Sequence, residues 1–162
     1  MVKKKPQINV DTRSSYLFMI KNSLGAKLFR NSYFRVNNRR VEVLKNGDLS
    51  CAYFVSSILY LFKLVKDIHI NVGKLVEDME KSGWRQIQRP KLGAVILWDL
   101  KKSVVGGRSH RHVGFFIDHK TAISNSSKKG VPVKHHLTYG QHPNGQPKRK
   151  ILIFYWHDLL NG

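Results

Sequence analysis

The C-terminal half of the sequence constrains the fold most, because it consists of short apolar runs joined by polar loops. The clearest runs span residues 94–98, 112–117, 120–125 and 151–156. Residues 130–139 add a further run, which Pro132 confines to an edge strand or an irregular stretch. Parallel neighbours need long crossover connections, usually helices, and these loops are too short for them. We therefore expect mostly antiparallel strands.

A helical stripe precedes these strands. Apolar side chains recur at helical spacing over four turns between residues 51 and 65: Cys51, Phe54, Val55, Ile58, Leu59, Phe62 and Val65. Further apolar residues widen the stripe beyond one face, which indicates a central and largely buried helix. Asp48 or Ser50 is expected to cap it.

Two shorter helices are expected on either side of the central helix. The first runs over residues 16–22, with Asp11 or Thr12 as its cap, and the second over residues 72–79, with Asn71 as its cap. Because the helices come first and the strands follow, the sequence predicts an α+β fold with a mostly antiparallel sheet.

The length of 162 residues suits one domain with a substantial core. We interpret residues 1–25 as a basic N-terminal segment with a short helix, and residues 26–162 as the single main domain. Residues 26–47 are basic and rich in turn formers, so we expect a long connection there with at most one strand.

The chain is strongly basic, with 29 Lys and Arg against 10 Asp and Glu and a formal net charge of +19. This charge favours polyanionic partners such as anionic cell-wall polymers, nucleic acid or anionic lipid. The basic clusters, for example residues 128–129 and 148–150, lie in polar segments and are expected to be solvated. No helix-turn-helix, zinc-finger or aromatic RNA-binding motif accompanies them, so the kind of polyanion stays open.

Several targeting and assembly features are not expected. The longest apolar run, residues 58–62, is far shorter than the roughly 20 residues of a membrane span. Residues 16–20 fall short of the apolar core of a signal peptide, which indicates a cytoplasmic protein or assisted export. The single cysteine, Cys51, excludes an internal disulfide framework, and we expect a monomer.

Cys51 stands at the start of the expected central helix, where unpaired N–H groups and the helix dipole lower the pKa of a thiol. The same N–H groups can bind an oxyanion. Such a nucleophile needs a base and a group that orients the base. His112 opens a strand, and Ser124 and Asn125 lie in the next strand, where either side chain could hydrogen-bond an imidazole.

Three segments resemble a known family, in the same order and at similar spacing. LSCAYFV at residues 49–55, RPKLGAVILW at residues 89–98 and HVGFFI at residues 112–117 are similar to segments of the NlpC-type endopeptidases. These are papain-like cysteine peptidases that cleave the stem peptides of peptidoglycan. The resemblance covers roughly residues 45–127.

The resemblance implies a papain-like NlpC-type fold, with a Cys-bearing helix packed on the sheet and residues 26–162 as the catalytic domain. It implies hydrolysis of an amide bond through a thioester, with Cys51 as nucleophile, His112 as base and no cofactor. Counted from His112, the third catalytic position falls at Ser124. We prefer Asn125, because an amide oxygen accepts the imidazole N–H well.

The sequence departs from the family pattern close to the nucleophile. Ser50 stands where the family has Asp, and Ala52 and Tyr53 stand where it has Ser and Gly, so the substrate need not be peptidoglycan. Two alternatives stay open. One is a papain-like amidase or acyltransferase, and the other is a non-catalytic basic domain that binds anionic polymer or nucleic acid.

The remaining histidines raise the question of a zinc site. His110 and His112 share a strand face, and His135, His136 and His142 follow downstream. No His-Glu-x-x-His motif or carboxylate at a familiar metallopeptidase spacing accompanies them, so no metal is expected. His135 could line the cleft, but we favour a simple place in a polar edge strand.

Overall fold

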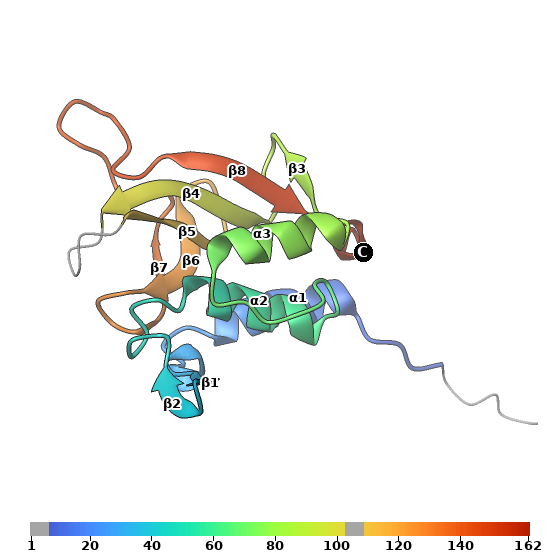
Figure 1. The fold of residues 1–162 in the computed structure, drawn as a ribbon. Helices are drawn as coiled ribbons and strands as arrows, with labels where there is room; N and C mark the ends of the chain where they lie inside the picture. Colours follow the sequence, from blue (N-terminus) through green and yellow to red (C-terminus); the bar gives the residue numbers. More distant parts are fainter. Residues whose placement is uncertain (1–6, 103–108) are drawn as a thin grey trace, which may run out of the picture.

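The larger sheet has helices packed on one side, in a computed structural model that describes residues 7–102 and 109–162 (Figure 1). Its strands run in the order β3-β8-β4-β5-β6-β7, and every pair of neighbours is antiparallel. These strands are β3 (Arg85–Ile87), β4 (Val95–Lys102), β5 (Ser109–Phe116), β6 (Thr121–Ser126), β7 (Val131–His136) and β8 (Ile151–Trp156). The expected α+β class with an antiparallel sheet is confirmed.

β7 lies at one edge of the sheet, as the proline in this run predicted. Pro132 faces Asn125 of β6, and its missing N–H is tolerated because β7 has only one neighbouring strand. β3 forms the opposite edge and was not anticipated. Its three residues are too few to leave a recognisable pattern in the sequence.

The central helix, α2 (Cys51–Leu61), packs against β5 and β6, and most of its side chains are buried. It ends a turn before the predicted Val65, because Lys63 adopts a left-handed conformation with a φ of 56°. The N–H of Leu64 then bonds to the carbonyl of Leu59, which closes the helix end.

The start of α2 also differs from the expectation. Ser50 occupies the N-cap position, but its side chain makes no capping hydrogen bond, and its buried Oγ has no partner in the described structure. Asp48 does not cap the helix either. The first N–H groups of α2 therefore stay available to other acceptors. The sulfur of Cys51 is such an acceptor.

The two flanking helices are confirmed with their caps. α1 (Thr12–Asn22) begins after Asp11, whose carboxylate accepts the N–H of Ser14 at 2.9 Å. α3 (Val72–Lys81) begins after Asn71, which accepts the N–H of Lys74 at 3.1 Å. None of the helices in the described ranges is long and apolar enough to cross a membrane.

The N-terminal helix belongs to the main core. Tyr16 and Ile20 of α1 are fully buried, and the hydroxyl of Tyr16 donates to the carbonyl of Gly93 at 2.7 Å. The ring of Tyr16 also meets those of Phe62 and Phe115 edge to face. This aromatic contact ties α1 to both the α2 region and the sheet.

The expectation of at most one strand within residues 26–47 is wrong. β1 (Tyr33–Val36) and β2 (Arg39–Glu42) form a separate antiparallel hairpin. The two residues between them, Asn37 and Asn38, have φ values of 48° and 62°. Asparagine tolerates this left-handed geometry, which tight hairpin turns require, so the Asn-Asn pair was the missed signal.

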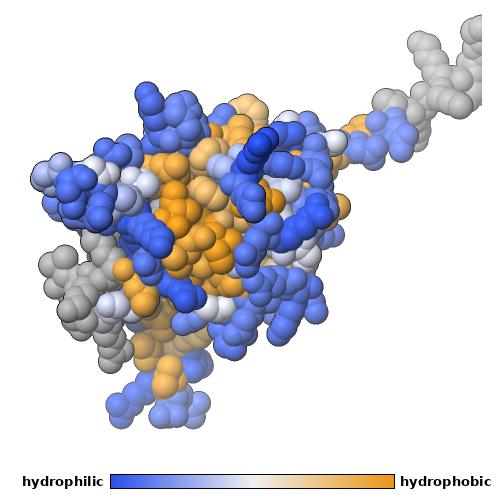
Figure 2. Space-filling view, turned by 90° about the horizontal axis from the view of Figure 1, so that it is seen from above, coloured by the Kyte–Doolittle hydropathy of each residue, from blue (hydrophilic) through white to orange (hydrophobic). Residues whose placement is uncertain are grey.

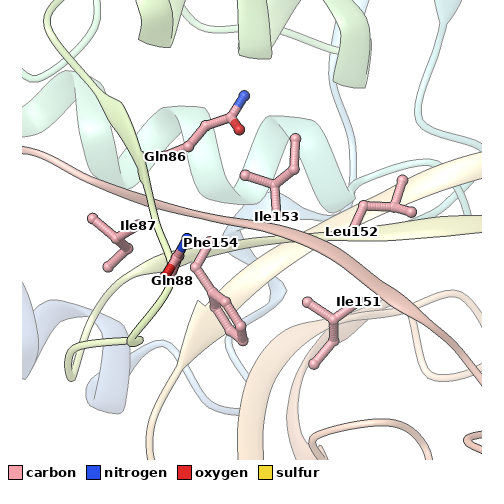
Figure 3. Close-up of a pocket in the computed structure, with 7 residues that line it drawn as sticks. All are labelled: Gln86, Ile87, Gln88, Ile151, Leu152, Ile153 and Phe154. Carbon is pink, nitrogen blue, oxygen red and sulfur yellow. The ribbon is translucent and has the colours of Figure 1, made fainter.

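An apolar surface covers the side of the molecule that carries β8, and hydrophilic residues surround it (Figure 2). β3 pairs with β8 only along Phe154, Tyr155 and Trp156, and a groove of about 560 Å³ lies where β8 continues beyond this pairing. Its lining consists of Gln86, Ile87, Gln88, Ile151, Leu152, Ile153 and Phe154 (Figure 3). No ionisable side chain lines the groove, so it lacks the groups for acid–base or nucleophilic chemistry.

Candidate active site

Cys51 is the first residue of α2 and is 7% exposed. The backbone N–H groups of Ala52, in the same helical turn, and of Val113 in β5 lie close enough to the sulfur to favour its thiolate. Val113 directly follows His112, so the helix start and the histidine strand meet at the sulfur. The prediction that Cys51 opens the central helix is confirmed, and its role as a nucleophile stays a prediction.

The expected low pKa of Cys51 is not found. Burial raises the pKa of the thiol, although the backbone N–H groups and the positive charge of Arg149 act in the opposite direction. The N–H contacts of the helix start are present, as the sequence argument required. They are outweighed because the sulfur is removed from water.

His112 is 4% exposed in β5, and its Nε2 lies 2.9 Å from Oγ of Ser124 in β6. Burial is the main reason why the pKa of His112 lies well below its ordinary value, and neighbouring positive charges add to this effect. Arg149 carries its charge throughout, whereas His135 and His110 contribute only when they are protonated. His112 and Cys51 are both held uncharged, and no hydrogen bond joins these two described residues.

The preference for Asn125 as the orienting group is wrong on geometry. Successive side chains of a strand point to opposite faces, so Ser124 and Asn125 cannot both reach His112. The amide of Asn125 donates to the carbonyl of Gly47 at 2.6 Å and so holds the turn before α2. Ser124, the position given by counting from His112, is the residue that bonds the imidazole.

The structure adds two residues to this cluster that the sequence argument missed. Nε2 of His135 lies 2.7 Å from Oγ of Ser124, and the hydroxyl of Tyr139 lies 3.0 Å from the same atom. The rings of His135 and Tyr139 stack with centroids 4.1 Å apart. His135 is therefore part of a half-buried cluster and not merely a polar residue of an edge strand.

A signal for His135 existed in the sequence. In the observed register Ala122 faces His135 and Ser124 faces Val133, so strand alternation puts Ser124 and His135 on the same face. That register depends on the β6–β7 turn, which the sequence did not specify to the residue.

Arg149 is also buried, at 9% exposure, although the basic cluster of residues 148–150 was expected to be solvated. Its guanidinium donates to the carbonyls of Asp99 at 3.2 Å and His110 at 3.1 Å, and it lies over the ring of Tyr139. It forms no ion pair within the described residues. Its unneutralised charge acts on Cys51, where it favours the thiolate.

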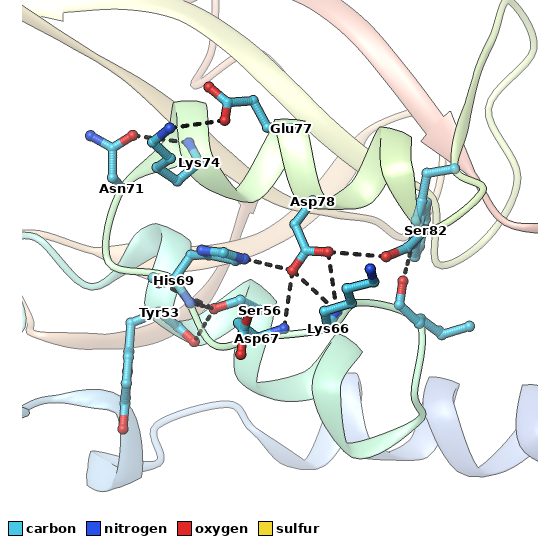
Figure 4. Close-up of polar contacts among 12 residues, drawn as sticks. Tyr53, Ser56, Lys66, Asp67, His69, Asn71, Lys74, Glu77, Asp78 and Ser82 are labelled. Atoms are coloured by element: carbon cyan, nitrogen blue, oxygen red, sulfur yellow. Dashed lines mark hydrogen bonds and ion pairs between the residues drawn. The ribbon is translucent and has the colours of Figure 1, made fainter.

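A half-buried histidine, His69, lies elsewhere, between α3 and the segment after α2 (Figure 4). Nε2 of His69 is 2.7 Å from the carboxylate of Asp78 in α3. The same carboxylate accepts the N–H groups of Lys66 and Asp67 and the hydroxyl of Ser82. Burial opposes ionisation of Asp78, but these bonds together lower its pKa to about 2.

The histidines considered for zinc do not assemble a metal site in the part of the chain that is described. There, no group of three or more His, Cys, Asp or Glu side chains is arranged to hold a metal ion. His112 and His135 are joined through the hydroxyl of Ser124 instead.

Comparison with known proteins leaves the family open. No model of a known protein family matches the chain, and no curated protein is significantly similar to it. The NlpC-type resemblance therefore stays an interpretation of three short segments. The case for a function depends on the geometry around Cys51.

Proposed function

We propose that this protein is a cysteine hydrolase with a papain-like arrangement, which cleaves an amide or peptide bond through a thioester acyl-enzyme. One observation carries the proposal. The sulfur of Cys51 contacts β5 at Val113, next to His112, whose Nε2 is held by Ser124. A buried thiol, an imidazole on the residue next to Val113 and a group that orients the imidazole are the parts that nucleophilic catalysis requires.

The reaction starts from the uncharged pair. As the sulfur of Cys51 attacks the carbonyl carbon, its proton passes to Nδ1 of His112, the ring nitrogen that Ser124 does not engage. The electron pair of the carbonyl moves to oxygen, and N–H groups of the first turn of α2 stabilise this oxyanion. When the intermediate collapses, the C–N bond breaks and the departing amine takes the proton from Nδ1.

Deacylation reverses these roles. Water attacks the carbonyl carbon of the thioester while Nδ1 of His112 accepts a proton from the water. The C–S bond then breaks, and Cys51 leaves as a thiolate that takes this proton from Nδ1. Arg149 assists both steps, because its positive charge favours the thiolate that forms transiently in a buried environment.

For the substrate we propose the stem peptide of peptidoglycan or a related cell-wall peptide, and the net charge of +19 suits an anionic polymer. An amidase or acyltransferase would use the same residues on another substrate. Tyr53 is half-buried two residues after Cys51, so the substrate-binding surface near the nucleophile differs from that of the NlpC-type family.

The test uses an activated ester, because acylation of Cys51 can then be measured without knowing the substrate. With p-nitrophenyl acetate, the wild type should release a burst of nitrophenol and gain one acetyl group by mass spectrometry. Cys51→Ala should show neither. His112→Ala should acylate roughly 10²–10⁴-fold more slowly, as expected when a general base is removed.

His119→Ala is the matched control, since His119 is exposed in the turn between β5 and β6. It should acylate at the wild-type rate. If His112→Ala and His119→Ala both acylate as fast as the wild type, His112 is not the base and the proposal fails.

One observation favours a second candidate, a non-catalytic basic domain that binds an anionic polymer or nucleic acid. Cys51 is buried and burial raises the pKa of its thiol, which also describes an inert core cysteine. For this candidate, the affinity for DNA or teichoic acid should fall steeply with salt. Cys51→Ala should bind as tightly as the wild type.

A further inference from the structure

The hydrogen bonds around Ser124 fix the positions of the hydroxyl and imidazole protons in this cluster, starting from His135. Nδ1 of His135 lies 2.8 Å from the carbonyl oxygen of His136. A carbonyl oxygen only accepts, so Nδ1 must carry the proton. In the neutral ring Nε2 is then a bare acceptor.

The hydroxyl of Ser124 has one proton to donate, and the position of His135 decides where it goes. Since Nε2 of His135 is an acceptor at 2.7 Å, the Ser124 hydroxyl donates to it. Oγ of Ser124 then accepts from its other two neighbours, the hydroxyl of Tyr139 and Nε2 of His112. Burial raises the pKa of Tyr139 to about 12, so this phenol keeps its proton and can donate.

It follows that Nε2 of His112 is protonated and Nδ1 is not. This is the tautomer in which His112 can accept a proton from Cys51. The donor at each step is set by the backbone carbonyl of His136, which cannot change its role. A hydroxyl alone could not impose this direction, because Ser124 can donate to or accept from an imidazole.

We propose that His135 is a positioning residue that holds His112 in its basic tautomer through Ser124, and that protonation of His135 reverses the chain and switches the base off. The catalytic consequence rests on the proposed function. Once Nε2 of His135 carries a proton, it donates to Ser124. With Tyr139 still donating to the same oxygen, both lone pairs of Oγ are occupied, so the Ser124 hydroxyl turns and donates to Nε2 of His112. The ring proton of His112 then lies on Nδ1 instead of Nε2. Because Nδ1 is the atom that accepts the proton of Cys51, His112 can no longer act as the base.

The groups that face His135 favour its neutral form at neutral pH. Its ring lies against Trp98 of β4 and Tyr139, and the titratable groups around it are His112 of β5, His136 of β7 and Arg149 before β8. Burial lowers the pKa of His135, the charges of Arg149 and His136 lower it further, and the His136 carbonyl opposes them. The reversal is therefore expected on the acid side of pH 6.5.

The test reads the tautomer directly, by nitrogen NMR of the full chain labelled with ¹⁵N-histidine. A bare ring nitrogen resonates far downfield of a protonated one, so Nδ1 and Nε2 of His112 can be told apart. At neutral pH, Nε2 of His112 should be protonated and Nδ1 bare. Acidification should protonate His135. At the same pH midpoint, Nε2 of His112 should become bare and Nδ1 should become protonated.

His135→Gln sharpens the test, because an amide oxygen can replace Nε2 as the acceptor but does not titrate. This variant should keep the neutral-pH tautomer of His112 and lose its exchange on acidification. In the ester assay, the acid limb of the acylation rate should shift to lower pH, whereas His119→Gln should leave the limb unchanged. A purely structural role for His135 would change the rate without moving that limb.

Two results overturn the proposal. One is a wild-type His112 with its proton on Nδ1 at neutral pH. The other is an exchange of tautomer that persists in His135→Gln, or in Ser124→Ala if the glutamine variant does not fold. The NMR results need no activity, so they are independent of the proposed hydrolase. If the tautomers are as stated but Cys51 cannot be acylated, the hydrolase fails and the hydrogen-bond chain stands.

Discussion

The half-buried His69 and the buried His112 are bound in opposite ways, and the contrast separates a structural contact from a candidate chemical group. His69 is paired with a carboxylate, Asp78, at 2.7 Å. His112 is paired with a hydroxyl, Ser124, at 2.9 Å, and positive charges surround it. A carboxylate stabilises a charged imidazole, whereas a hydroxyl among cations leaves the imidazole neutral with a free lone pair.

The partners show what each site does. Asp78 accepts hydrogen bonds from the segment after α2 and from the end of α3, so its carboxylate links these two parts of the chain (Figure 4). Ser124 collects its bonds from side chains, and one of them, His135, is itself bonded to a backbone carbonyl. The backbone N–H donors to Asp78 cannot change their role, whereas the side-chain hydrogen bonds of Ser124 can reverse their direction.

The largest effect is expected at Asp78. Asp78→Ala leaves the N–H groups of Lys66 and Asp67 without their acceptor, which should cost about 3 kcal/mol of unfolding free energy. Urea denaturation measures it. Glu77→Ala, one residue earlier on the exposed face, should cost less than about 0.5 kcal/mol. Equal losses in both variants would contradict the structural role of Asp78.

The carboxylate of Asp78 should also determine how the unfolding free energy falls at low pH. Its pKa is about 2 in the folded chain, below the ordinary value near 3.9 in the unfolded chain. The stabilisation is therefore complete above about pH 4 and is lost as the pH falls toward 2, by on the order of 2 kcal/mol. The stability gap between the wild type and Asp78→Asn should narrow over this range. A gap that does not change with pH would show that the carboxylate charge is unimportant.

Arg149 should distinguish the two histidines electrostatically. Arg149→Met removes a positive charge that acts on Cys51 and His112. The pKa of the Cys51 thiol should rise further, and that of His112 should also rise. The pH dependence of iodoacetamide alkylation reports the thiol, and NMR reports both histidines. The ring signals of the distant His69 should stay as in the wild type at neutral pH, and a change there would mean that the substitution disturbs the whole fold.

Local patterns in the sequence predicted much of the fold. The apolar stripe identified α2, and the short apolar runs identified the main strands, because burial of one face or both faces leaves a periodic pattern. β1 and β2 were missed, since their side chains are mostly exposed and carry no such pattern. The end of α2 was misplaced, because Leu64 and Val65 are buried without being helical.

The site was less predictable, because its contacts join residues distant in the chain. Cys51 and His112 could be found from their positions at the start of a helix and in a strand. Arg149 could not, since its burial depends on carbonyls of Asp99 and His110 that only the folded chain brings to it. His135 required the register of β6 and β7, and a slip of one residue exchanges the faces.

Asn125 offers the smallest and most selective test, because it is the chain neighbour of Ser124 on the opposite face of β6. Asn125→Ala removes the donor to the carbonyl of Gly47, and it also removes a buried Oδ1 that has no partner in the described structure. The two effects oppose each other, so the net loss should be about 1 kcal/mol of unfolding free energy. The His112 tautomer should stay as in the wild type, whereas Ser124→Ala should change it with the fold intact. If Asn125→Ala altered the tautomer and Ser124→Ala did not, the two faces of β6 would have been assigned the wrong way round.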